Sequence, residues 1–194
     1  MKTIWIIFLF LFSVHVFAQG SIYDLETSWK NAKNETIKFS EFQGKPVVLA
    51  MVYTSCPHTC PLIVEKLREI YASSGLKEDE IHLVLMTFDP EVDTPEILSQ
   101  FKAKKNIHQK NWNFLQGSLE TTRIMSVLLN VSYQKDEKTG VFTHDNKIFL
   151  IDPKGEMIET LSGLDQSIQP IIQKLSKRKS LLQKIKSYFK NLFY

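Results

Sequence analysis

Residues 47–61 read VVLAMVYTSCPHTCP and join a short apolar run to the only two cysteines of the chain. Residues 47–52 are uncharged and rich in β-branched side chains, which predicts a central strand buried on both faces. Pro61 suits the first turn of a helix, because its fixed φ fits there and its missing N–H is not needed. The next apolar residues fall on one helical face: Leu62, Ile63, Leu67 and Ile70. The stretch therefore predicts a strand, a turn that carries Cys56 and Cys60, and a helix.

The predicted turn places both thiols beside the positive end of a helix dipole. This environment lowers the pKa of a thiol and favours the thiolate, which is both a nucleophile and a ligand for soft metals. A disulfide across only three intervening residues would close a short loop and add little stability to a chain of 194 residues. We therefore interpret Cys56 and Cys60 as a reactive pair and not as a structural disulfide.

Strand-like and helix-like segments alternate through the rest of the chain. We expect further strands at residues 37–40, 81–88, 112–115, 147–151 and 157–161, and helices after Cys60, from about Thr94, over 119–130 and from about Leu164. This order predicts an α/β class with a thioredoxin-like fold, in which helices flank a mainly parallel central sheet with an antiparallel hairpin at one edge. Reactive loops then gather at the carboxyl ends of the parallel strands, where the cysteine turn also lies.

The first 18 residues have the composition of a secretory signal peptide. Met1 and Lys2 give a positive start, residues 4–12 form an apolar core, and residues 16–18 offer the small side chain that signal peptidase reads. Retention of this segment as a membrane anchor is the alternative, but the apolar run is short for a span of ~20 residues. We therefore expect residues 1–18 to be removed from an exported, periplasmic protein whose residues 19–175 form the thioredoxin-like domain.

Residues 176–194 form a third segment, which we predict to be a basic amphipathic helix. From Gln166 to Tyr194 there are seven lysine or arginine residues and no acidic residue, although the whole chain has a formal net charge of only +3. Apolar residues recur at helical spacing: Leu181, Leu182, Ile185, Tyr188, Phe189 and Leu192. Residues 177–194 could therefore lie on an anionic membrane surface, and packing against the protein's own domain is the alternative. Nucleic acid is not an expected partner of an exported protein.

The three residues between the cysteines allow a disulfide, but they also allow both thiolates to bind one ion. Sulfur ligands select soft cations, Cu(I) before Zn(II), and two thiolates leave such an ion in need of a third donor. The candidates are His58, His82, His108 and His144. His82 lies in an apolar strand and His108 in a polar run. We choose His144, because its loop faces the cysteine turn in a thioredoxin-like fold.

The chain resembles the SCO/SenC family of thioredoxin-like copper chaperones for cytochrome c oxidase assembly. The resemblance covers about residues 36–175, and four segments carry it: Gly44 to Leu49, Tyr53 to Pro61, Phe88 to Glu96 and His144 to Gly155. By this resemblance Cys56, Cys60 and His144 match the copper ligands of the family. The Cys-Pro-x-x-Cys-Pro motif with a downstream histidine is specific, the more so beside the Asp-Pro-x-x-Asp-Thr-Pro loop.

Two features depart from the family pattern. Thr143 stands before His144 where family members commonly have aspartate, and Asp145 follows instead, so a carboxylate that orients the imidazole is not assured. The signal segment looks cleavable, whereas many members keep a membrane anchor. Asp89 and Asp93 could lie near the site, although a helix cap and a solvated loop explain them equally well.

The resemblance implies a copper metallochaperone and not a turnover enzyme. Cys56, Cys60 and His144 would bind Cu(I) or Cu(II) and deliver it to, or mature, the dinuclear copper site of cytochrome c oxidase. The implied partners are the copper-site subunit of the oxidase or its assembly factors. Two alternatives stay open: a thiol–disulfide oxidoreductase that reduces a partner's cysteine pair through Cys56 and Cys60, and a redox or copper sensor.

Overall fold

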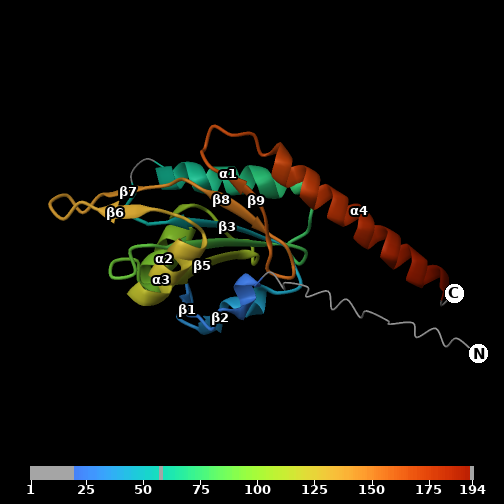
Figure 1. Ribbon diagram of the computed structural model, residues 1–194, viewed down its shortest axis with the longest axis horizontal. Coiled ribbons are helices and arrows are strands. Elements are labelled where there is room, and N and C mark those ends of the chain that lie inside the picture. Colours follow the sequence, from blue (N-terminus) through green and yellow to red (C-terminus); the bar gives the residue numbers. More distant parts are fainter. Residues whose placement is uncertain (1–19, 57–58, 193–194) are drawn as a thin grey trace, which may run out of the picture.

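The computed structural model describes residues 20–192 apart from residues 57 and 58, and Figure 1 shows it as a ribbon. The predicted signal segment, residues 1–18, and His58 lie outside the described residues. Within the described part of the chain, no helix combines the length and the apolar character needed to cross a bilayer.

The described residues form strands, α-helices and two short 3-10 helices. The strands are β1 (Ser28–Asn31), β2 (Thr36–Lys38), β3 (Val47–Val52), β4 (His82–Thr87), β5 (Trp112–Gln116), β6 (Tyr133–Lys135), β7 (Phe142–His144), β8 (Ile148–Ile151) and β9 (Met157–Leu161). The helices are α1 (Thr59–Ser74), α2 (Pro95–Lys104), α3 (Leu119–Leu128) and α4 (Gln169–Leu192), with 3-10 helices η1 (Ile22–Asp24) and η2 (Phe39–Phe42).

Seven strands form one mixed sheet in the order β2-β1-β5-β4-β3-β8-β9, and β6 and β7 form a separate antiparallel hairpin. Strands β3, β4 and β5 run parallel at the centre. Antiparallel strands flank them, β8 and β9 on one side and β1 and β2 on the other. The thioredoxin-like α/β class is therefore confirmed, with parallel pairing limited to the three central strands instead of most of the sheet.

The segment before β3 differs from the expected pattern. Strand β1 was not anticipated, because it is mostly polar and only Trp29 of its four residues is buried. The strand expected over residues 37–40 ends at Lys38, where the chain turns into η2. Phe39 and Phe42 are both buried, and their spacing of three places them on the same side of a helical turn but on opposite faces of a strand.

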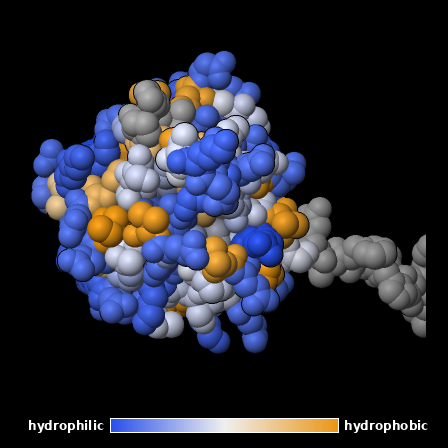
Figure 2. All heavy atoms as spheres, turned by 90° about the vertical axis from the view of Figure 1, so that its left-hand side faces the viewer, coloured by the Kyte–Doolittle hydropathy of each residue, from blue (hydrophilic) through white to orange (hydrophobic). Residues whose placement is uncertain are grey.

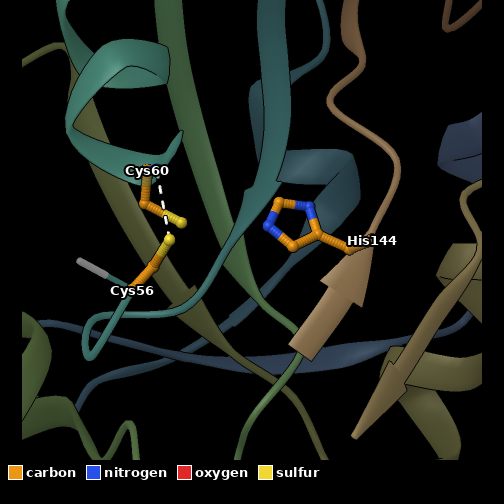
Figure 3. Close-up of side chains that lie close together, drawn as sticks. All are labelled: Cys56, Cys60 and His144. Carbon is orange, nitrogen blue, oxygen red and sulfur yellow. Dashed lines mark hydrogen bonds between the residues drawn. The ribbon is translucent and has the colours of Figure 1, made fainter. Parts of the chain in front are cut away.

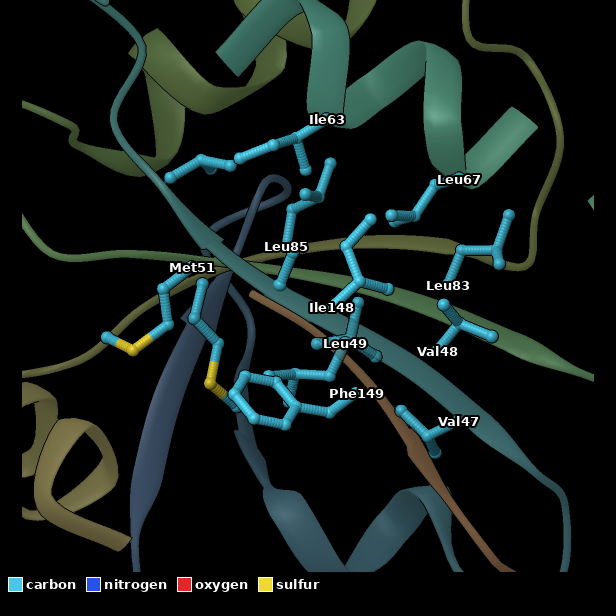
Figure 4. Packing of buried hydrophobic residues seen from close by; sticks show 14 of the residues in the cluster. Val47, Val48, Leu49, Met51, Ile63, Leu67, Leu83, Leu85, Ile148 and Phe149 are labelled. Atoms are coloured by element: carbon cyan, nitrogen blue, oxygen red, sulfur yellow. The ribbon is translucent and has the colours of Figure 1, made fainter. Parts of the chain in front are cut away.

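The core packs on both faces of β3, which is buried along its whole length. Figure 4 shows Ile63 and Leu67 directed from α1 onto one face of the sheet, while Leu49 and Phe149, paired across β3 and β8, fill the other. Leu62, which was expected on the buried face of α1, is 56% exposed, so this expectation was wrong. The packing fixes the carboxyl end of β3 against the amino end of α1, with Cys56 between these two ends and Cys60 in the first turn of α1.

The two ends of the molecule have different structures. Helix α1 begins near the β6–β7 hairpin, as Figure 1 shows on the left. Helix α4 packs beside α1 and then extends away toward the other end of the molecule. The cysteine turn and the far end of α4 are therefore well separated.

His82 is packed in the structure, as the sequence indicates. Its ring meets Phe42 edge-on, with 5.0 Å between the ring centroids. Burial, with a smaller contribution from the positive charge of Lys45, lowers the pKa of His82 to about 4. The neutral ring thus packs against Phe42 at the edge of the core, where His82 is half-buried.

We expect the substitution His82→Leu to reduce the loss of stability on acidification. In the folded protein His82 stays neutral down to about pH 4, whereas a histidine in the unfolded chain takes up a proton near pH ~6.5. Between these pH values proton binding favours the unfolded chain. The group therefore lowers the free energy of unfolding by up to ~1.4 kcal/mol for each pH unit of acidification. Urea unfolding at neutral pH and near pH ~5 measures the effect. An equal drop in the wild type and the variant would contradict the prediction.

Candidate metal centre

Cys56 and Cys60 lie where β3 passes into α1. The N–H of Cys60, in the first turn of α1, donates to Cys56 Sγ at 3.4 Å, and the N–H of Tyr53 donates to Cys60 Sγ at 3.4 Å. Both side chains are buried and no disulfide joins them; Cys56 is 8% exposed and Cys60 0%. The turn therefore holds two sulfur atoms side by side, with Cys56 nearer to solvent.

His144 comes from a distant part of the chain and closes the group. It is the last residue of β7, where it lies opposite Tyr133 of β6. Its Nδ1 atom lies 3.1 Å from the carbonyl oxygen of Asp145, and a proton donated there leaves the ring's lone pair on Nε2. Figure 3 shows the imidazole directed toward the side chains of Cys56 and Cys60.

The three side chains can hold a metal ion. The two Sγ atoms and a ring nitrogen of His144 all lie within 4.8 Å of one another, the only such group among the residues that the structure describes. Three ligand atoms bound to one ion at ~2.3 Å lie about 4 Å apart in a trigonal arrangement, so shifts of less than about 1 Å suffice. Two thiolates and one imidazole are a soft donor set that suits copper or zinc.

Burial has the largest effect on the pKa of the Cys60 thiol. The expectation of a lowered thiol pKa is wrong for Cys60, because burial raises its pKa well above the ordinary value and outweighs the hydrogen bond from the N–H of Tyr53. Since a metal binds the thiolate, loading this site displaces a proton from Cys60.

Aromatic side chains enclose the histidine. The ring of His144 lies against Phe88, with 4.8 Å between centroids, and edge-on to Tyr53 at 5.9 Å. Tyr53 also contacts Phe142, with 5.0 Å between centroids. Burial, and next a hydrogen bond with the thiol of Cys56, raise the pKa of Tyr53 to about 12, so its hydroxyl stays protonated. This wall fixes the plane of the imidazole and keeps water from one side of the group.

A buried carboxylate fastens the cysteine turn to the sheet. Asp93 is 0% exposed and accepts hydrogen bonds from the N–H of Thr54 at 2.9 Å, from the hydroxyl of Thr54, and from the hydroxyl of Thr87 at 2.5 Å. Burial raises the pKa of Asp93, although these hydrogen bonds act in the opposite direction. Thr54 stands two residues before Cys56, so Asp93 holds the start of the turn in place.

The other candidate residues stand outside the sulfur–imidazole group. Asp89 forms an ion pair with Lys135 at 3.2 Å. The carboxylate of Asp145 accepts from the N–H of Ser132 and pairs with Lys147, so only its backbone carbonyl meets the imidazole. Hydrogen bonds, and the charge of Lys147, lower the pKa of Asp145. His108 is exposed.

Sequence reasoning left three contributions to this site unassigned. It named Asp93 as a residue that could lie near the site, beside the alternative of a helix cap or solvated loop, but gave it no contact, and it gave no role to Tyr53 or Phe88. The one signal for Asp93 is its place directly before Thr94, which caps α2 and so fixes the direction of the loop. No local pattern marks the aromatic wall, because its members come from separate strands and loops.

A thioredoxin-like fold that carries two thiols and an imidazole at a strand–helix turn defines a class of proteins that bind soft metals or exchange disulfides. The sequence profile of the SCO1/SenC family matches residues 23–180, so this chain belongs to that family. An SCO2-like protein of Rickettsia typhi is 27% identical over 143 residues, which cover 72% of this chain and 69% of the relative. The mitochondrial SCO2 homolog of Bos taurus is 31% identical over 124 residues, which cover 60% of this chain and 45% of the relative.

Solved structures agree with the fold. A SCO1/SenC family lipoprotein from Bacillus anthracis superposes with a TM-score of 0.71 at 26% identity, over 80% of this chain and 94% of that one. Copper-bound ScoI of Bradyrhizobium japonicum superposes with a TM-score of 0.66 at 20% identity, over 78% of this chain and 96% of that one.

Proposed function

We propose that this chain is a copper metallochaperone that carries one copper ion on Cys56, Cys60 and His144. The observation that supports this is the convergence of two sulfur atoms and one ring nitrogen within 4.8 Å. Thiolates suit Cu(I) and imidazole suits Cu(II), so this donor set can follow copper through both oxidation states. Structures of copper-bound ScoI proteins on the same fold support the choice of metal.

Copper is the cargo of such a protein, and the donor set fits transfer. Three ligands leave room at the ion for a donor from a partner, which then replaces the protein's ligands one at a time. Cys56 is 8% exposed and His144 is half-buried, whereas Cys60 is fully buried. Cys60 is therefore the last ligand that a partner reaches, and the copper leaves through the side where Cys56 and His144 lie.

The proposed recipient is the dinuclear copper site of cytochrome c oxidase, reached in the periplasm after export. Support comes from the family, whose members include a Sco protein described as a cytochrome c oxidase assembly protein. Figure 2 views the end of the molecule that carries the β6–β7 hairpin and shows small apolar patches divided by hydrophilic surface. Such a surface favours brief contacts with a partner over a permanent apolar interface.

A second candidate function uses the same sulfur atoms. The N–H of Cys60 donates to Cys56 Sγ and so favours a thiolate at the more exposed cysteine. That thiolate could attack a partner's disulfide, form a mixed disulfide and release one partner thiolate. The thiolate of Cys60 would then attack Cys56 Sγ, release the second partner thiolate and leave an oxidised Cys56–Cys60 pair.

A transfer experiment tests the proposed function. The reduced chain, loaded with one copper ion and freed of excess metal, is mixed with the metal-free, reduced copper-binding domain of the oxidase subunit. We expect copper to move to that domain while both cysteines of the chain stay reduced. The copper content of each protein is measured after the two proteins are separated. Copper that stays on the chain, or fails to bind it tightly, would contradict the metallochaperone. Reduction of an oxidised copper-binding domain by the metal-free chain would instead favour the reductase.

We expect His144→Ala to weaken copper binding selectively. Two thiolates still hold Cu(I), so its affinity should fall by about 10- to 100-fold, whereas Cu(II) loses the ligand that suits it best. Chelator competition measures the first effect, and the Cu(II) electron paramagnetic resonance signal measures the second. His108→Ala is the matched control, because His108 is exposed and lies outside the group. Equal effects of the two substitutions would exclude His144 as a ligand.

A further inference from the structure

Helix α4 extends well beyond the residues that pack it against the domain. It runs from Gln169 to Leu192, but its buried anchors, Ile171 and Leu175, lie in the first third. Beyond Leu175, none of the α4 side chains that the structure describes is buried. Figure 1 shows this part of the helix projecting from the domain toward the right. The helix therefore continues for 17 residues, from 176 to 192, and the side chains described in this part lend it no buried contact with the core.

One face of this projecting helix combines exposed apolar and cationic side chains. Lys177, Leu181, Lys184 and Tyr188 are spaced by four, three and four residues, so they lie on the same face. Leu181 is 58% exposed and Tyr188 67%. Neither Lys177 nor Lys184 pairs with an acidic residue among those that the structure describes. We call these four residues the α4 face.

The α4 face continues onto the domain. Ile158 of β9, together with Lys174, Leu181 and Lys184, lines an open hollow along the helix. Among these lysines, Lys174 forms an ion pair with the domain, with Glu159 of β9 at 3.3 Å. Apolar surface with a cationic border therefore reaches from the far part of α4 to the edge of the sheet.

Such a helix needs a partner. Isolated helices of ~12–15 residues are marginal in water, because helix formation gains most of its stability from packing of an apolar face. Exposed leucine and tyrosine beside lysine match a helix that lies flat on a membrane, with its apolar side chains in the headgroup region and its lysine stems reaching the anionic surface. The absence of any acidic residue from Gln166 to Tyr194 specifies the sign of that surface as negative.

We propose that the α4 face binds the surface of an anionic phospholipid membrane. This proposal goes beyond the metal centre and does not depend on it. Because α4 ends far from the β6–β7 hairpin, membrane contact leaves the group of Cys56, Cys60 and His144 accessible to a partner (Figure 1). The helix would then keep the protein at the membrane while its metal site faces away from the lipid.

Vesicle binding tests the proposal. The chain from Gln19 onward, as processing would leave it, is sedimented with vesicles of neutral phosphatidylcholine, with or without anionic phosphatidylglycerol. We expect binding to the anionic vesicles only, and weaker binding at high salt. Each lysine near such a surface contributes about a fivefold factor, so Lys177→Gln with Lys184→Gln should lower the partition coefficient roughly 30-fold. Leu181→Ser should also weaken binding, which a purely ionic contact would not require.

The matched control removes the same charge elsewhere. Lys38→Gln with Lys138→Gln changes two exposed lysines, on β2 and in the loop between β6 and β7, and should leave binding almost unchanged. Equal losses in the two double variants would show a general charge effect and overturn the proposal. So would equal binding to neutral vesicles, or no vesicle binding at all, which would favour a protein partner. Copper binding by all variants should match that of the parent chain, so a failed metal site and a failed membrane site are distinguishable.

Discussion

Replacement of Cys60 with serine is expected to abolish tight copper binding by the reduced chain. Cys60 offers a soft sulfur from a fully buried position, whereas a serine hydroxyl there is a hard, protonated oxygen that does not suit Cu(I). Loss of a group that only orients a metal ligand lowers the affinity by up to about 100-fold. Cys60 is itself a proposed ligand, so we expect its loss to lower the affinity by more than this. Competition with a chromophoric Cu(I) chelator under anaerobic, reducing conditions measures the change.

The control for this variant lies in the same turn. Ser55 is exposed and precedes Cys56, so Ser55→Ala changes the turn without touching a sulfur and should bind copper like the wild type. Serine is close to cysteine in size and can still accept from the N–H of Tyr53, so Cys60→Ser should alter stability by no more than about 1 kcal/mol. Unchanged copper affinity in a folded Cys60→Ser protein would show that Cys60 is not a ligand.

The same variant separates the two candidate functions. Cys60→Ser keeps the more exposed thiol, Cys56, but removes the thiol that would resolve a mixed disulfide. A reductase with this change should accumulate a covalent complex with an oxidised partner, visible on a non-reducing gel. A protein that only transfers copper should form no such complex.

The sequence predicts the positions of the candidate ligands better than their environment. Cys56 and Cys60 follow from a local pattern, an apolar strand followed by a proline at the start of a helix. His144 requires the fold as well, and the structure places it beside the thiols because β7 ends there. The raised pKa of Cys60 depends on how much protein surrounds the sulfur, which neither spacing nor helix position reveals.

The strand pairing of the sheet, too, can be predicted only in part from the sequence. The parallel pairs β3–β4 and β4–β5 follow from the alternation of strands and helices. The antiparallel pairing of β1 with β5 does not, because β1 is short and polar, and its register is set by a strand more than 80 residues away, with Lys30 opposite Gln116. Long-range pairing of this kind leaves little trace in a local sequence pattern.

Replacement of Asp93 with alanine is expected to weaken both folding and metal binding. The carboxylate accepts two hydrogen bonds from the half-buried Thr54 and one from the buried Thr87, and alanine would leave these donors without that acceptor. Loss of these hydrogen bonds should lower the free energy of unfolding by about 3 kcal/mol, measured by urea denaturation. Release of Thr54 also loosens the turn before Cys56, so copper affinity should fall by about 10- to 100-fold, as when an orienting partner of a metal ligand is lost.

A core variant separates these two effects of Asp93. Ile151 is fully buried in β8 opposite Val47, at the end of β3 away from the cysteines, and Ile151→Ala should cost about 2–5 kcal/mol. Under conditions where both variants are folded, Ile151→Ala should bind copper like the wild type, whereas Asp93→Ala should not.

Because burial raises the pKa of Asp93, the favourable contribution of its side chain is largest in acid and declines as the pH rises through that pKa. The stability difference between the wild type and Asp93→Ala should therefore be larger at acidic than at neutral pH. Normal copper affinity in Asp93→Ala would mean that the turn holds its geometry without the carboxylate.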